Sequence, residues 1–189
     1  NYTEANAWQY SLYVPQDISG LMNLMGGKDK LEAHLDALFS AKKETSGREQ
    51  ADITGLIGQY AHGNEPSHHM AYLYNFVNKP HKTQELVHQI LTELYTNTPD
   101  GISGNEDCGQ MSAWYVFSSL GFYPVTPGSN QYIIGAPLFP KASMNLENGK
   151  TFTVVAENIS EINKYVEYVY LNDNELERTY ITHEELMAG

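Results

Sequence analysis

The sequence predicts a mainly α-helical fold that is followed by a C-terminal β segment. Before residue 121, several stretches carry apolar residues at helical spacing. After residue 124, prolines become frequent and short runs of strand composition replace that spacing. This change divides the chain into two predicted parts, residues 1–125 and residues 126–189. A length of 189 residues suffices for one domain with a core and a small appendage.

Two helices are predicted in the first part, after an opening segment whose aromatic and polar side chains suggest that it lines a site. The first covers 17–25, with Asp17 as its cap and a Gly-Gly pair at its end. The second covers 28–41, with apolar residues at helical spacing: Leu31, Leu35, Leu38 and Phe39. Residues 42–63 are polar, rich in glycine and without a sustained period, which predicts a loop.

Three further helices are predicted over 66–78, 82–95 and 107–120. Pro66 suits the first turn of a helix, where an N–H has no partner. The first of the three is expected to turn one apolar face inward, made of Met70, Leu73, Tyr74 and Val77. In 107–120, Trp114 is expected in the core. Successive helices joined by loops indicate a helical hairpin array or part of an α/α barrel.

The second part contains short runs with the composition of strands, at 132–134, 151–156, 166–171 and 180–181. An Asn-Gly pair at 148–149 follows the apolar run 144–146 and predicts a β-hairpin. These strands are too few to close a sandwich. We therefore expect the chain to be a fragment whose partner strands lie upstream, an expectation that the missing initiator Met also favours.

Charge and composition restrict the possible functions. The net charge is −12, from 23 acidic and 11 basic residues, which disfavours binding to nucleic acid or to an anionic membrane. No stretch has the length of a transmembrane helix. The single cysteine, Cys108, excludes an internal disulfide and a Cys-based zinc site and is expected to be a small buried residue.

Two stretches share the letters Gly-Asn-Glu and precede predicted helices: Gly-Asn-Glu-Pro-Ser-His-His at 63–69 and Gly-Asn-Glu-Asp-Cys-Gly-Gln at 104–110. Both could be simple helix caps, because acceptor side chains and negative charge are favoured at a helix start. Their crowding of carboxylates, amides and imidazoles argues for more than capping.

Four carboxylates lie in segments rich in aromatic, amide or His residues, which are Glu4, Glu65, Glu106 and Asp107. Hydrolysis of a glycosidic bond requires one protonated carboxylic acid and one carboxylate on opposite sides of the anomeric carbon. Carboxylates that come from distant loops fit this requirement. Each of them could also be ordinary surface charge.

The pair His68-His69 cannot chelate one metal ion, because neighbours on a helix point about 100° apart. One of them could face a site while the other packs. Asn64 and Glu65 provide an amide oxygen and a carboxylate, which are hard donors suited to calcium. The spacing alone is a weak signal for calcium.

The opening stretch Tyr-Thr-Glu-Ala-Asn-Ala-Trp-Gln-Tyr at 2–10, the stretches 63–74 and 104–115, and Gly-Phe-Tyr-Pro-Val at 121–125 resemble motifs of the glycoside hydrolase family 92 α-mannosidases. The resemblance covers essentially the whole chain. It implies calcium-dependent, inverting enzymes that remove terminal mannose, with an N-terminal β-sandwich and an (α/α)6 barrel. This chain would be the latter part of the barrel, followed by strands that join the sandwich.

The resemblance also implies roles for individual residues. Glu4 matches the general acid, Asp107 matches the general base and Glu106 is its less certain neighbour. Asn64 and Glu65 lie where the family binds Ca²⁺. The candidate sugar contacts are Trp8, His68, His69 and Gln110. An inverting mechanism implies that the carboxyl groups of Glu4 and Asp107 lie roughly 6.5–9.5 Å apart.

Further expectations follow from this resemblance. The substrate would be a mannose-containing glycan, with an α-1,2 linkage as first expectation, although the sequence does not distinguish the linkages. The protein would be exported, to the periplasm or the surface of a bacterium, and the missing sandwich would be its partner. This chain alone would be weakly active or inactive. Alternatives are a non-catalytic carbohydrate-binding module and a structural helical domain without ligand.

Overall fold

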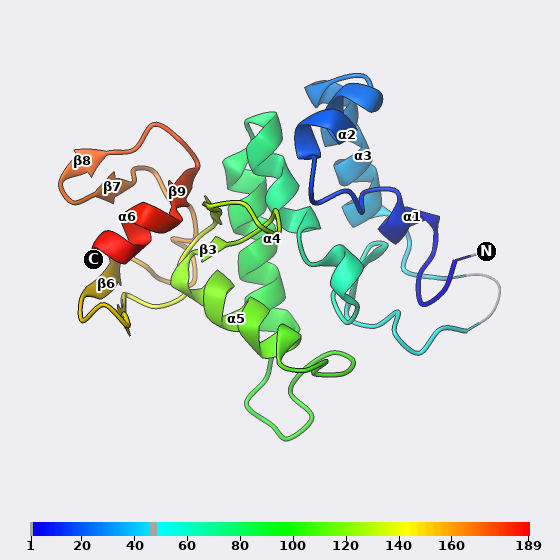
Figure 1. Cartoon of the computed structure of the whole chain (residues 1–189). Helices are drawn as coiled ribbons and strands as arrows, with labels where there is room; N and C mark the ends of the chain where they lie inside the picture. Colours follow the sequence, from blue (N-terminus) through cyan, green and yellow to red (C-terminus); the bar gives the residue numbers. More distant parts are fainter. Residues whose placement is uncertain (1, 46–48) are drawn as a thin grey trace.

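The computed structural model describes residues 2–45 and 49–189, which form a helical part followed by small sheets (Figure 1). Helices α1 to α3 span Ala7–Tyr10, Ile18–Leu24 and Lys28–Ser40. The 3₁₀ segments η1 and η2 span Glu65–Ser67 and Met70–Val77. Helices α4, α5 and α6 span Pro80–Glu93, Gln110–Leu120 and His183–Ala188.

Every sheet in the described residues is small and antiparallel. The strands of the first hairpin, β1 and β2, are Leu56–Ile57 and Tyr60–Ala61. The three-stranded sheet has the order β3-β4-β9, formed by Phe122–Tyr123, Gln131–Ile134 and Tyr180–Thr182. Two more hairpins are β5–β6, Lys141–Asn145 with Thr151–Val155, and β7–β8, Tyr170–Leu171 with Asn174–Glu175.

The predicted helices over 17–25, 28–41 and 82–95 are confirmed as α2, α3 and α4, with Asp17 capping α2 through a bond from Gly20 N. The Asn-Gly turn at 148–149 indeed joins β5 to β6. Hairpin β1–β2 lies within residues 42–63, where only a loop was expected. The short helices α1 and α6 were not predicted either.

The prediction of an α-helix with one inward face over 66–78 is wrong. The stretch forms 3₁₀ turns, and η2 is buried nearly all round because α3 and α4 both pack against it. The carbonyls of His68 and Ala71 accept hydrogen bonds from the Trp114 indole and the Thr83 hydroxyl. Side chains thus bond carbonyl groups that a regular helix would use itself.

The main core lies between the helices and contains Leu31, Leu35, Leu38, Tyr72 and Trp114 with no exposed surface. The expected core position of Trp114 is therefore confirmed. A second, smaller core lies under the C-terminal sheets and is formed by Phe122, Phe152, Ile181 and Leu186.

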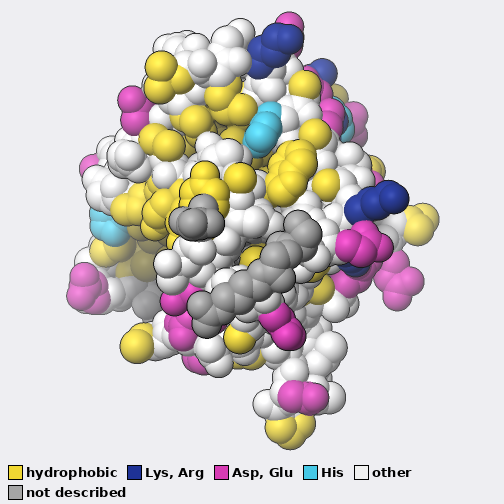
Figure 2. Space-filling model, turned by 90° about the vertical axis from the view of Figure 1, so that its right-hand side faces the viewer, with side chains coloured by type: hydrophobic (Ala, Val, Ile, Leu, Met, Phe, Trp, Pro, Cys, Tyr) yellow, Lys and Arg dark blue, Asp and Glu magenta, His cyan; other side chains and the backbone are white. Residues whose placement is uncertain are grey.

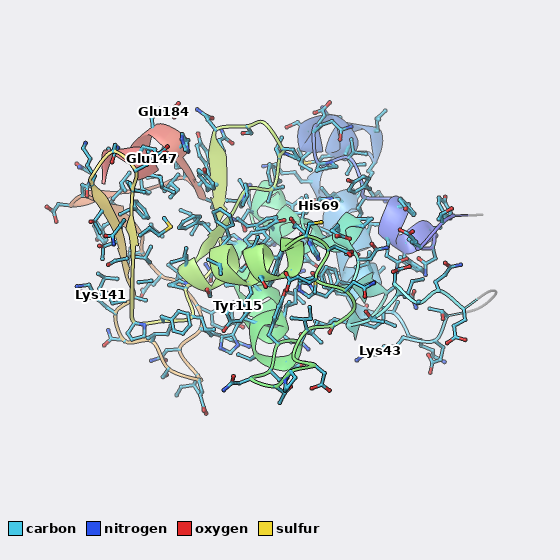
Figure 3. All side chains as sticks on the ribbon, turned by 60° about the horizontal axis from the view of Figure 1, so that its bottom comes forward. Lys43, His69, Tyr115, Lys141, Glu147 and Glu184 are labelled. Carbon is cyan, nitrogen blue, oxygen red and sulfur yellow. The ribbon has the colours of Figure 1, made fainter. Side chains whose placement is uncertain are left out.

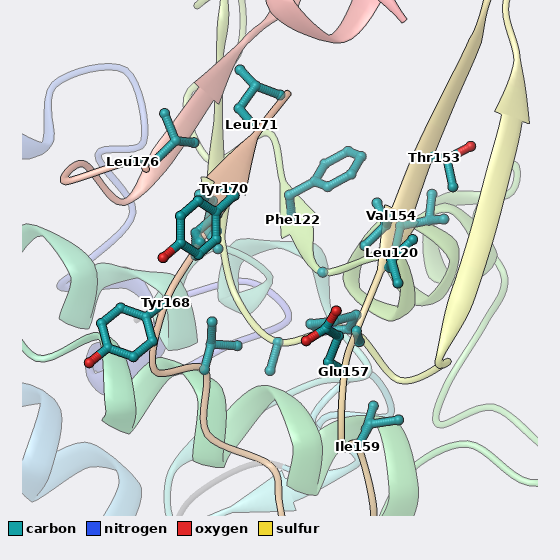
Figure 4. A pocket seen from close by; sticks show the side chains of 18 of the residues that line it. Leu120, Phe122, Thr153, Val154, Glu157, Ile159, Tyr168, Tyr170, Leu171 and Leu176 are labelled. Carbon is teal, nitrogen blue, oxygen red and sulfur yellow. The ribbon is translucent and has the colours of Figure 1, made fainter. Parts of the chain in front are cut away.

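A cleft of about 1160 Å³ opens beside this second core, between the residues after β6 and strand β7 (Figure 4). None of the residues predicted for the site lines it.

No helix in the described residues is both long and apolar enough to cross a membrane. The boundary near residue 125 stays a prediction, and β3 pairs with β4 across it.

Candidate functional site

Glu4 lies on an exposed turn just before α1, with its backbone in the left-handed region at φ 61°. Such a conformation is uncommon for a residue with a Cβ. Helix α1 is capped reciprocally, since Asn6 Oδ1 accepts from Trp8 N and Gln9 Oε1 accepts from Asn6 N. The cap fixes the direction in which the chain enters α1.

Side-chain amides attach the segment that bears Glu4 to the rest of the protein. The amide nitrogen of Asn64 donates to the Glu4 carbonyl at 2.7 Å. Asn6 Nδ2 donates to Gln59 Oε1 at 2.9 Å, and Gln9 Nε2 donates to the Gln59 carbonyl at 2.5 Å. Glu4 is thereby held beside residues 63–69, which lie some sixty positions later in the chain.

The two Gly-Asn-Glu stretches touch each other at their glycines. A Cβ on Gly104 would lie 2.8 Å from the carbonyl oxygen of Gly63, and one on Gly63 would lie 1.9 Å from Thr54 Oγ1. Only glycine allows the two backbones to approach this closely. The residues that follow, Glu65 and Asp107, are consequently brought to the same place.

Three of the predicted acids influence one another. The pKa of Glu65 is raised, chiefly by burial, and also by the charge of Asp107, a hydrogen bond with Asp107 and the charge of Glu4. The charges of Glu4 and Asp107, which come from two distant segments, thus both act on Glu65.

The helix predicted over 107–120 is present as α5, which begins three residues later, at Gln110. Asp107, Cys108 and Gly109 all have positive φ, at 48°, 56° and 93°, which a right-handed helix cannot include. The expectation that Cys108 is buried is wrong. Its side chain is exposed, since the loop that ends in these residues stands out at the surface.

Glu106 and Asp107 point to different partners. The carboxylate of Glu106 accepts hydrogen bonds from Ser112 N at 2.9 Å and from Ser112 Oγ at 2.8 Å. Glu106 therefore bonds the first turn of α5, as the helix-cap interpretation predicts. Asp107 instead contributes to the raised pKa of Glu65.

Both histidines of the pair are buried and point inward, at 2% and 4% exposure for His68 and His69. His69 lies inside the molecule, where its Nε2–H donates to the Leu12 carbonyl at 2.8 Å (Figure 3). Its ring also meets that of Tyr13 edge-on. The idea that one of the two faces a site while the other packs stays a prediction.

His68 is a buried residue that bonds the predicted site residue Gln110. Burial lowers its pKa to about 4, so the ring is neutral at neutral pH. Its Nε2–H donates to the His62 carbonyl at 2.9 Å, which leaves Nδ1 to accept from Gln110 Nε2 at 3.0 Å. Gln110 also donates to the hydroxyl of Tyr123 at 3.2 Å. Trp8 is half-buried and lies against His34.

Sequence reasoning did not single out His62, Tyr95 and Tyr123. His62 is fully buried, and its Nε2–H donates to Tyr95 Oη at 2.6 Å because that hydroxyl itself donates to the Met111 carbonyl. The hydroxyl of Tyr60 donates to His62 Nδ1 at 2.7 Å. Such chains of neutral donors and acceptors span distant segments, so no local pattern marks them.

The donor chemistry around Glu65 suits a hard cation. Asn64 uses its amide nitrogen for the Glu4 carbonyl and keeps its oxygen as an acceptor, beside the carboxylate of Glu65. Within residues 2–45 and 49–189, Lys and Arg form no ion pair with Glu4, Glu65 or Asp107. In the described residues, no three or more His, Cys, Asp or Glu side chains are grouped so that they alone could hold a metal ion.

The face that carries the N-terminal elements shows more acidic than basic side chains (Figure 2). An acidic surface agrees with the net charge of −12. It would attract a cation and leave a neutral sugar unaffected.

The model of the glycosyl hydrolase family 92 catalytic domain matches residues 1–189. The chain belongs to this family. A secreted glycosidase of Arthroderma benhamiae is 32% identical over 98% of the chain and 22% of that protein. The resemblance inferred from the motifs is thus confirmed.

Solved structures of the family agree with the fold. A GH92 α-mannosidase of Bacteroides thetaiotaomicron in complex with mannoimidazole has a TM-score of 0.91 and 44% identity, over 96% of this chain and 24% of that one. A GH92 inverting mannosidase of the same bacterium has a TM-score of 0.85 and 40% identity, over 100% and 27%. The chain therefore spans about a quarter of the length of these relatives. The expected (α/α)6 barrel stays a prediction.

Proposed function

We propose that the intact protein that carries this chain is a glycoside hydrolase which removes terminal α-linked mannose from glycans. The observation that carries this proposal is that the charges of Glu4 and Asp107 both act on Glu65, while Asn64 bonds the backbone of Glu4. The names of the GH92 relatives, an α-mannosidase bound to mannoimidazole and an inverting mannosidase, support the substrate and the stereochemistry.

In this proposal Glu4 is the general acid and Asp107 the general base. Glu4 is exposed on its turn, so its carboxyl group is open to a ligand from the solvent. Asp107 lies beside Glu65, whereas Glu106 is engaged with Ser112, so Asp107 is the better candidate to activate water. The inverting mechanism requires a gap of roughly 6.5–9.5 Å between the two carboxyl groups, to leave room for the water.

Ca²⁺ is the proposed cofactor, and Asn64 Oδ1 and Glu65 are the groups of this chain that would hold it. When bound, calcium would contribute positive charge beside the hydroxyls of the mannose. The chain's own residues keep these donors available: Asn64 is fixed through its nitrogen, and Glu65 stands at the start of η1.

The proposed sugar contacts are Trp8 and Gln110, which are half-buried near the acids. His68 and His69 were expected to touch sugar as well. Their burial and their bonds to backbone carbonyls suit a supporting role better. The secreted relative supports the proposal that the intact protein is exported, and we retain an α-1,2 linkage as the first to test.

The test is the variant Glu4→Gln in the intact protein, assayed on two classes of substrate. Hydrolysis of α-linked mannobiose should fall about 10²–10⁴-fold, because its leaving alcohol needs a proton from the acid. Hydrolysis of dinitrophenyl α-mannoside should change little, because this leaving group departs as a stable anion. A panel of mannobioses with different linkages, with and without a calcium chelator, gives the preferred linkage and the metal dependence.

Glu93→Gln is the matched control, since Glu93 is an exposed glutamate at the end of α4 whose carboxylate accepts a hydrogen bond from Gln89. It should hydrolyse both substrates as the wild type does. If the intact protein binds mannosides and hydrolyses neither substrate, the alternative of a carbohydrate-binding module replaces the proposal.

A further inference from the structure

Asn64 is bound to the backbone of Glu4, sixty positions away. Its amide nitrogen donates to the Glu4 carbonyl oxygen at 2.7 Å, and its side chain is largely buried, with the residue 8% exposed. The side-chain oxygen of Asn64 takes no part in this bond. The nitrogen and the oxygen can thus serve different purposes.

The bond from Asn64 is made to the peptide unit of Glu4, whose backbone conformation is unfavourable by itself. Glu4 has φ 61°, a left-handed conformation that residues with a Cβ adopt only when their surroundings determine it. If the backbone of Glu4 rotated to the ordinary region of negative φ, the Glu4 side chain would point in another direction. The bond from Asn64 opposes that relaxation, because it fixes the carbonyl that such a rotation would move.

The other bonds of the segment do not replace this one. Asn6 and Gln9 attach α1 to Gln59, and the cap of α1 orders the chain from Asn6 onward. Both lie after Glu4. The hydroxyl of Tyr10 donates to the Thr3 carbonyl at 3.0 Å and holds the peptide before Glu4, whereas the carbonyl of Glu4 itself is bonded by Asn64. In the part of the chain that the structure describes, Asn64 alone contributes a side-chain bond to the Glu4 backbone.

We propose that Asn64 is a positioning residue for Glu4, which acts through its amide nitrogen to hold the acid in its strained, productive direction. The proposal rests on the proposed function, in which Glu4 protonates the leaving group. It differs from the role of a calcium ligand, which uses the oxygen of Asn64. It predicts a loss of proton donation with an otherwise competent site.

Asn64→Asp separates the two roles in the intact protein, because it replaces the donor nitrogen by an acceptor and keeps a ligand oxygen. A positioning residue predicts at least a ten-fold loss on α-linked mannobiose, and less than about two-fold on dinitrophenyl α-mannoside, which needs no acid. A calcium ligand predicts that both substrates are hydrolysed about as before, with unchanged or tighter calcium binding. That second outcome would overturn the proposal.

Asn75→Asp is the matched control. Asn75 is 5% exposed, and its amide nitrogen also donates to a backbone carbonyl at 2.7 Å, that of Ile134, far from the acids. The chemical change is the same, so any loss from a buried new charge should appear here too and should affect both substrates equally. Circular dichroism and thermal melting establish that each variant is folded.

Asn64→Ala provides a second test should the aspartate variant not fold, since it adds no charge. Because alanine also removes the proposed ligand oxygen of Asn64, the positioning role predicts a loss on mannobiose that exceeds the loss on dinitrophenyl α-mannoside at least ten-fold. A role only as a calcium ligand predicts equal losses on both substrates and weaker calcium binding. The proposed function fails separately: if Glu4→Gln leaves mannobiose hydrolysis intact, Glu4 is not the acid. If Glu4→Gln abolishes it and both Asn64 variants do not lower it, only the positioning role is refuted.

Discussion

His68 is neutral because it is buried, with a pKa of about 4 instead of 6.5. Its two nitrogens have different partners, since Nε2–H donates to a carbonyl and Nδ1 accepts from Gln110. A protonated ring could not accept that second bond. The position of Gln110, and through it Tyr123, therefore depends on a histidine that stays uncharged.

The burial of His68 predicts a loss of stability in acid. Between pH 6.5 and about 4 the unfolded chain binds a proton that the folded protein excludes, so stability is complete above this window and falls as the pH drops through it. The loss amounts to about 3 kcal/mol for this one residue. The buried His62 and His69, whose pKa values are also lowered by burial, act in the same direction.

Melting temperatures of the intact protein at about pH 7 and about pH 4.5 measure this effect. His68→Gln should reduce the difference between the two temperatures. His81→Gln, at an exposed position of α4, should leave it unchanged. An equal difference in the wild type and in His68→Gln would contradict the prediction.

Residue identities were predictable from the motifs, whereas backbone conformations were not. The sequence marked Glu4, Glu65 and Asp107 as candidate acids. It did not show that Glu4 and Asp107 have left-handed backbones or that Cys108 is exposed. Tertiary bonds, such as the one from Asn64 to the Glu4 carbonyl, decide these features, and no local pattern encodes them.

At the scale of elements, signals that act within a few residues of one another were reliable. The Asn-Gly turn of β5–β6 and the cap of α2 are local, and both were predicted. The stretch 66–78 was mistaken for a regular helix, because the carbonyls of His68 and Ala71 bond Trp114 and Thr83, which lie on other helices. Hairpin β1–β2 was missed because each strand has only two residues.

The close approach of Thr54 to Gly63 predicts that Gly63→Ala is destabilising. Gly63 lies outside the left-handed region, so the cost is steric and comes mainly from Thr54 Oγ1, 1.9 Å from the new Cβ. We expect a loss of about 1–3 kcal/mol in the free energy of unfolding. Denaturant unfolding measures it.

Thr54→Ala should restore a large part of this loss in a double variant, since it removes the hydroxyl that the new Cβ meets. That hydroxyl is buried without a hydrogen-bond partner in the described part of the chain, so Thr54→Ala alone should cost little. Strictly additive losses would show that the two positions do not interact, contrary to the predicted contact.

At the scale of the whole molecule, the predicted acids and the cleft beside the C-terminal sheets lie in different regions. The cleft lies beside the C-terminal sheets and is bordered by side chains that are well exposed, such as Ile162 at 84%, Tyr168 at 62% and Tyr170 at 60%. An exposed apolar patch of this kind commonly contacts another part of a protein. The chain spans about a quarter of the length of its relatives.

We therefore predict that the 189-residue chain, produced alone, hydrolyses mannosides at less than about a hundredth of the rate of the intact protein. The acids would be present, but the remaining walls of the sugar site would not hold the substrate in place. Mannose release at equal molar concentrations tests this. A rate that matches the intact protein would refute it.

The exposed thiol of Cys108 offers a direct way to observe the site. This chain has a single cysteine, and it follows Asp107 directly on a loop at the surface. A thiol-reactive fluorophore would attach at that one position in the chain, one residue from the proposed base. Its emission could then report the arrival of a cation or a sugar in solution, without any turnover.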